Sequence, residues 1–181
     1  MPVKGKAWWR VDIGTYCGWL PGDKRGFRSH DHNIHSSGDY KNPPLPEEHE
    51  GLRNYHENRS PEPIDIPREL RLIVARAIAE TLKREGHQVL VVSCADRHAH
   101  IVAELPIELR EFNKAIGRAK AMSSLAIRKW LPGRVWAHDD AHDMLDNRSY
   151  QLNAYRYVRN KQGPEAAVWC QDGLRREAVK D

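Results

Sequence analysis

Apolar residues recur along the chain with two different periods, and the change of period marks where one predicted element gives way to the next. Residues 7–13 (AWWRVDI) are aromatic and β-branched with partial alternation, which is typical of a strand. Between 65 and 86 apolar residues recur every three or four positions, so we predict a helix that ends at a glycine. Short apolar runs at 87–94 and 98–105 predict two strands joined by a tight turn.

The second half repeats this change of period. Pro106 opens a helical pattern that ends near residue 132, and a short strand is predicted at 134–138, followed by an exposed acidic turn. A last helix is predicted from about 147 to 161. The order strand, helix, hairpin, helix, strand, helix predicts an α+β fold, a ferredoxin-like sandwich in which helices pack mainly on one face of an antiparallel sheet.

The length of the chain is that of one domain, which we place at 1–163, with a C-terminal tail at 164–181. Residues 17–63 interrupt the pattern with glycines, prolines and polar residues, so we predict a long irregular insertion there. The histidine-rich stretch at 30–35 lies in this insertion and is interpreted as solvated loop. The sequence pattern predicts no role for the 17–63 insertion.

Composition narrows the class of protein without naming a function. A net charge of +4 is compatible with a polyanionic partner but is also common in basic soluble proteins. Three widely spaced cysteines form no disulfide or zinc framework, which indicates a reducing compartment. The start of the chain lacks an apolar signal core and no run is long enough to span a membrane, so we expect a cytoplasmic protein.

Two histidines on the predicted central strand are candidate metal ligands. Alternate residues of a strand share a face, so His98 and His100 point the same way, with Ala99 turned opposite. Neutral imidazole binds divalent transition metals well. An isolated His-x-His pair usually arises by chance, but a pair on a central strand has to be stabilised in a buried setting.

The last predicted helix (NRSYQLNAYRYVRN) carries a tyrosine-rich face. Tyr150, Asn153 and Tyr157 fall on one side of it by three- and four-residue spacing. A phenol is a poor nucleophile at neutral pH unless a metal or a base assists it. Taken alone, the pattern is more typical of an amphipathic helix that packs on the sheet, and Tyr155 and Tyr157 are interpreted as packing residues.

Together the two motifs resemble a known family. The stretch CADRHAHIVAEL resembles the HUH signature (histidine, hydrophobic residue, histidine) of single-tyrosine transposases, and SYQLNAYRYVRN resembles the tyrosine helix of their REP-associated branch. The resemblance implies that His98 and His100 bind Mg or Mn and that Tyr150 is the nucleophile. It further implies cleavage of single-stranded or hairpin DNA through a covalent 5′-phosphotyrosine, by a monomer or a homodimer.

Two departures from the family pattern accompany the resemblance. Relatives often place a third metal ligand one helical turn after the tyrosine, where this chain has Ala154, so Asn153 is the predicted substitute. Arg97 stands before the first histidine, where the family often has asparagine. A catalytically inactive, domesticated DNA-binding relative is therefore the alternative function, and a ferredoxin-like RNA-binding module is a third.

Further residues are candidates for DNA contacts and for support of the metal site. We predict that four basic residues contact the phosphate backbone: Arg110, Lys114 and Arg118, which form a row on the 106–132 helix, and Arg97 beside the histidine pair. Such a row is more usually a solvated helix face. In the acidic tract at 138–143, Asp139 or His142 could orient the metal ligands by hydrogen bonding to them.

Overall fold

The computed structural model describes residues 2–23, 36–37, 42, 44–45 and 47–171, and the predicted loop histidines at 30–35 lie outside them. Within this part of the chain the helices and strands follow the order β1 (Lys6–Thr15), α1 (Glu50–Glu57), α2 (Arg68–Arg84), β2 (Val89–Cys94), β3 (His98–Pro106), α3 (Leu109–Ile127), β4 (Trp136–Met144), α4 (Arg148–Asn160) and β5 (Ala167–Cys170).

The strands form one antiparallel sheet in the order β4-β1-β3-β2-β5, so β3 is the central strand. β3 pairs with β1 on one side and with β2 on the other, and the β2–β3 pair is the predicted hairpin. In this register His100 lies opposite Asp12 of β1 and opposite Ser93 of β2. The predicted α+β class with an antiparallel sheet is confirmed.

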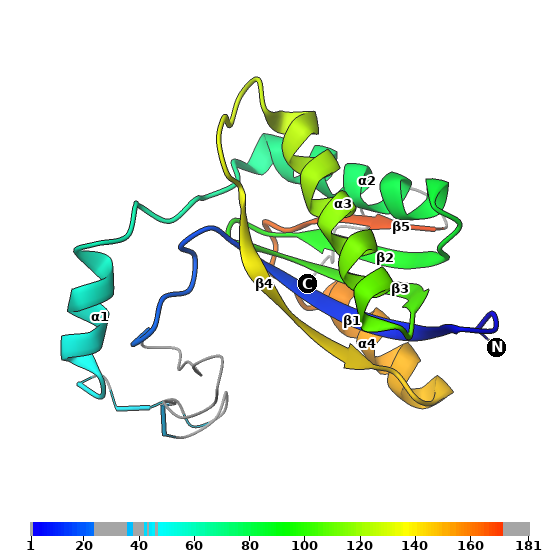
Figure 1. Ribbon diagram of the computed structural model, residues 1–181, viewed down its shortest axis with the longest axis horizontal. Helices are drawn as coiled ribbons and strands as arrows, with labels where there is room; N and C mark the ends of the chain where they lie inside the picture. Colours follow the sequence, from blue (N-terminus) through cyan, green and yellow to red (C-terminus); the bar gives the residue numbers. More distant parts are fainter. Residues whose placement is uncertain (1, 24–35, 38–41, 43, 46, 172–181) are drawn as a thin grey trace.

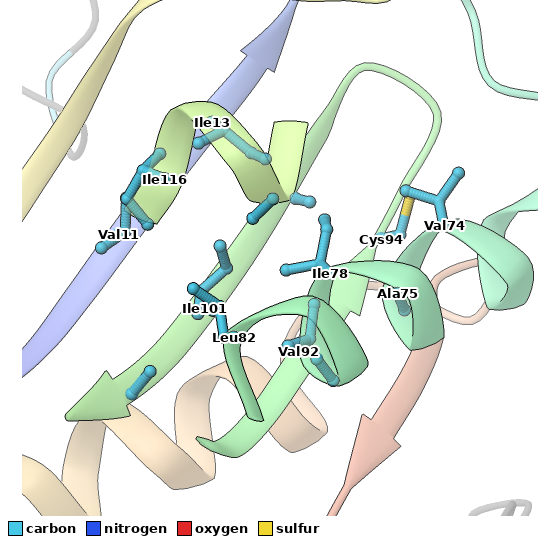
Figure 2. Close-up of a cluster of buried hydrophobic side chains, with 14 of the residues drawn as sticks. Val11, Ile13, Val74, Ala75, Ile78, Leu82, Val92, Cys94, Ile101 and Ile116 are labelled. Atoms are coloured by element: carbon cyan, nitrogen blue, oxygen red, sulfur yellow. The ribbon is translucent and has the colours of Figure 1, made fainter. Parts of the chain in front are cut away.

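Helices α2 and α3 cover one face of the sheet and α4 lies on the other (Figure 1). The larger core lies between the sheet and the α2–α3 layer, and Figure 2 shows Val92 and Ile101 of the sheet meeting Ile78 and Leu82 of α2. Odd-numbered residues of β3 enter this core, because alternate side chains of a strand point to opposite faces. The even-numbered residues, including both histidines, consequently face the α4 side.

A smaller core holds α4 against the sheet. Val91 and Val102 of the central hairpin pack there against Ala154 and Val158 of the helix. Asn147 begins the helix by accepting a hydrogen bond from the backbone N–H of Tyr150 at 2.8 Å. This packing fixes how α4 is rotated, and so decides which of its side chains face the histidines.

Three elements differ from the sequence-based prediction. The predicted acidic turn after residue 138 is wrong, because β4 continues through it to Met144 and pairs with β1. β5 lies in the stretch assigned to a C-terminal tail, where it pairs with β2 as an edge strand. α1 lies in the stretch predicted to be irregular. It contains no buried residue, so the sequence has no apolar stripe from which the helix could be predicted.

Two compositional expectations can be compared with the structure. No helix among the described residues is long and apolar enough to cross a membrane. All three cysteines are free thiols, as expected from their number and spacing. Burial raises the pKa of the Cys94 thiol to about 12, so this cysteine is a packing residue at neutral pH.

Candidate functional site

The two histidines lie side by side at the start of the central strand. Their ring centroids are 4.8 Å apart and the rings are nearly perpendicular. His100 is 9% exposed, and His98, the first residue of the strand, is partly exposed. The predicted geometry, two imidazoles projecting from one face of a central strand, is therefore present.

A carboxylate on the neighbouring strand orients the second histidine. Asp12 Oδ1 lies 2.5 Å from His100 Nδ1, and Arg10 joins Asp12 to Asp143 of β4. A carboxylate beside Nδ1 favours a proton on that nitrogen, which leaves Nε2 of His100 as the free electron-pair donor. The sequence analysis missed Asp12; its same-face alternation with Arg10 on β1 was the available signal.

The environment of His98 favours the neutral imidazole, the form that binds metals. Burial lowers the pKa of His98, and the neighbouring His100 lowers it further. A hydrogen bond to the side chain of Gln162 opposes part of this shift. Because such a bond favours the protonated ring, the imidazole N–H donates to the amide oxygen of Gln162.

The tyrosine that contacts the histidines is Tyr157. Its ring centroid lies 5.9 Å from that of His100, and its side chain is 46% exposed. Tyr150 lies two helical turns earlier, about 10 Å along the helix axis at 1.5 Å per residue, and is 40% exposed. Tyr155 packs in the smaller core, and its hydroxyl accepts a hydrogen bond from Arg159.

Gln162 reaches the histidines because α4 ends one turn after Tyr157. The backbone N–H of Lys161 and the side-chain amide of Gln162 both donate to the carbonyl oxygen of Tyr157, at 2.9 and 3.3 Å. Gly163 follows with a φ of 83°, a left-handed conformation that suits glycine and reverses the chain. The family spacing did not point to Gln162, because the position one helical turn after Tyr157 is Lys161.

The side chains at this site include only some of the usual ligands of a divalent metal. No group of three or more His, Cys, Asp or Glu side chains suited to a metal ion occurs among the described residues. The site instead offers the imidazoles of His98 and His100, with Gln162 bonded to the ring of His98. Ser93 adds a buried hydroxyl without a hydrogen-bond partner, next to His100 across the hairpin.

The predicted DNA-contacting row lies away from this site. Arg110, Lys114 and Arg118 are on α3, which covers the opposite face of the sheet (Figure 1). Lys114 forms an ion pair with Glu111, and Arg118 forms one with Glu85, so two of the three charges already have acidic partners. These pairs are what a solvated helix face shows.

The remaining predicted residues are distributed around the sheet. Arg97 forms an ion pair with Asp65 at the hairpin turn, and the bonded carboxylate has a lowered pKa. Asn153 is exposed on α4, one turn before Tyr157. His142 packs against Phe112 of α3, on the face opposite the histidine pair, and Asp139 is an exposed residue of β4.

Comparisons with known proteins show a distant similarity in fold but do not assign the chain to a family. No family model matches the sequence. No curated protein matches it significantly either. Among solved structures, the chain is similar to a REP-associated tyrosine transposase bound to a REP hairpin. The two share 11% identity, with 87% of this chain and 67% of that chain covered, at a TM-score of 0.44. A TM-score this low leaves the function to be argued from the site.

Proposed function

We propose that the protein is a metal-dependent endonuclease and strand transferase that cuts single-stranded DNA and holds the 5′ end on a tyrosine. The observation that carries the proposal is that the rings of His98, His100 and Tyr157 lie in contact on one face of the sheet. The family resemblance of the sequence motifs points to the same chemistry. The geometry favours Tyr157 as the nucleophile, whereas the family resemblance implied Tyr150.

His98 and His100 would hold the metal, and Gln162 would orient the His98 ring through its hydrogen bond. When bound, a divalent metal would neutralise charge on the oxygens of the scissile phosphate. Imidazole donors suit Mn, which tolerates nitrogen ligands, better than Mg, which prefers oxygen. Asp12 would hold the His100 ring in place, since its carboxylate fixes the Nδ1 side of that ring.

In the proposed reaction the phenolic oxygen of Tyr157 attacks the phosphorus of the scissile phosphate. A bond forms between that oxygen and phosphorus, and the bond from phosphorus to the 3′ oxygen breaks. The phenol loses its proton, and the departing 3′ oxygen gains one, so a free 3′ hydroxyl is released. Attack of another 3′ hydroxyl on the phosphotyrosine reverses these changes and joins the strands.

The first prediction distinguishes the two candidate nucleophiles. The protein is incubated with hairpin-containing single-stranded DNA and Mn, and a covalent adduct is sought on a denaturing gel. We expect Tyr157→Phe to abolish the adduct while DNA binding persists, because only the nucleophilic oxygen is lost. Tyr150→Phe removes the same atom from the same helix and should still form the adduct, which makes it the matched control.

Each other outcome reassigns the function. An adduct that survives Tyr157→Phe but not Tyr150→Phe would restore the assignment made from the sequence pattern. If the parent forms no adduct with Mn or Mg, the inactive DNA-binding relative becomes the better description. His98→Ala should also abolish the adduct, and added Mn should rescue that variant in part but never Tyr157→Phe.

A further inference from the structure

One flank of α4 remains exposed beside the candidate site and has no role in the proposed chemistry apart from Tyr157. The α4 flank consists of Tyr150, Asn153, Tyr157 and Asn160, which follow one another at three- and four-residue spacing. All four side chains are exposed. The helix packs on the sheet through other positions, Gln151, Ala154 and Val158, so packing does not require aromatic residues on this flank.

The charged side chains of α4 and of the turn that follows it are all cations. No aspartate or glutamate occurs from Asn147 to Pro164, although the chain contains 25 acidic residues among 181. The same stretch holds four cations: Arg148, Arg156, Arg159 and Lys161. Within the described part of the chain none of them forms an ion pair with a carboxylate; Arg148 and Arg159 bond to neutral oxygens instead. On α3, by contrast, Lys114 and Arg118 are paired with Glu111 and Glu85.

We propose that the α4 flank binds single-stranded DNA and that Tyr150 stacks on a base near the phosphate at Tyr157. Exposed aromatic rings beside unpaired cations are the features that bind single strands with little sequence preference. Tyr150 and Tyr157 are about 10 Å apart along the axis, a span of about three stacked nucleotides at 3.4 Å each. This assignment rests on the proposed function for the position of the phosphate, but binding itself requires no cleavage.

The test measures the affinity of the full chain for a labelled oligothymidine of about 20 nucleotides, longer than a typical single-strand site. EDTA is present throughout, so that no cleavage occurs. We expect Tyr150→Ala to weaken binding about five- to a hundred-fold through loss of stacking. Tyr150→Phe keeps the aromatic face and should bind like the parent.

A pair of double variants tests the charge contribution. Replacing Arg156 and Lys161 with alanine should lower the slope of log affinity against log salt by about 0.7 for each lost phosphate contact. The matched control replaces Lys114 and Arg118 of α3, which removes the same charge from the opposite face, and should leave the slope unchanged. A duplex that contains the oligothymidine should compete poorly, because its base faces are already stacked.

Several outcomes would overturn the proposal: parent-like binding by Tyr150→Ala, an equal loss of slope in the α3 variant, or equal competition by duplex. Should Tyr150→Ala fail to fold by circular dichroism, Tyr150→Leu keeps apolar bulk without an aromatic face and tests the same point. Binding that depends on Tyr150 without any adduct would retain this proposal and remove the nuclease. If the adduct forms but binding does not depend on Tyr150, the nuclease is retained and the present proposal is removed.

Discussion

Asp12 determines the orientation of the more buried of the two histidines. Its carboxylate lies 2.5 Å from His100 Nδ1 and also pairs with Arg10, which itself pairs with Asp143. Because β1 and β3 pair with Asp12 opposite His100, the contact follows directly from the register of the sheet. The residue would act on a metal only through the histidine, as a positioning residue.

We predict that Asp12→Ala weakens Mn binding by about 10- to 100-fold, the usual effect of removing a group that orients a ligating histidine. Asp12→Asn should lose less, because its amide oxygen can still accept the Nδ1 proton. Isothermal titration with Mn measures both. Equal affinity in the parent and in Asp12→Ala would show that the carboxylate does not orient a ligand, while a matched loss in Asp143→Ala would point to the whole charge network.

His98 makes the stability of the fold depend on pH. Burial, followed by the charge of His100, lowers the pKa of His98 below its ordinary value of about 6.5. Below that value the unfolded chain binds a proton that the folded chain does not, so the stabilising contribution is complete above pH 6.5 and is lost as pH falls. His87 is shifted in the same direction, first by burial and then by Lys6.

We therefore expect the free energy of unfolding to fall between about pH 6.5 and pH 5. His98→Asn should show a smaller decrease over this range, because one of the two shifted histidines no longer titrates. His87→Asn is the matched control and should reduce the decrease independently of the metal site. Urea denaturation of the three proteins at both pH values gives the six free energies needed, and an identical decrease in the parent and in His98→Asn would refute the expectation.

Helix α4 is positioned by its cap and by a narrow apolar stripe. Its N-cap, Asn147, accepts from Tyr150 N–H, and Ala154 and Val158 pack against the central hairpin. The stripe is narrow, so the helix leaves both flanks open. One flank thereby brings Tyr157 to His100 and leaves Tyr150 in solvent.

Asn147→Ala should lower the free energy of unfolding by about 1 kcal/mol, the usual value of an N-cap side chain. Asn147→Asp preserves the acceptor and should be close to the parent. Asn153→Ala, exposed on the same helix, should also change stability little, and chemical denaturation distinguishes the three variants. A neutral Asn147→Ala would mean that packing alone holds the start of α4.

The sheet divides the molecule into a structural face and a candidate functional face. α2 and α3 cover one face with the larger apolar core, whereas α4 lies on the other face with the histidine pair (Figure 1). Two buried polar side chains, His100 and Ser93, lie there, next to the partly exposed Asp12 network. Dividing the two tasks between faces lets the larger core stabilise the fold without constraining the chemistry of the site.

Local pattern was enough to predict most of the sheet. The alternation of β3 placed His98 and His100 on one face, because side-chain direction in a strand depends only on position along it. Likewise the apolar spacing of α2, α3 and α4 predicted each helix. β5 and the extension of β4 were missed because edge strands with polar or irregular patterns are stabilised by their neighbours rather than by their own alternation.

The partners of the histidines depended on long-range packing. Asp12 reaches His100 through strand pairing across 88 positions of the chain. Gln162 reaches His98 through the chain reversal at Gly163. The spacing of the tyrosines allowed either Tyr150 or Tyr157 to serve the site, since both lie on one flank. Only the rotation and position of α4 on the hairpin brought Tyr157 to His100, because those are set by contacts between residues far apart in the chain.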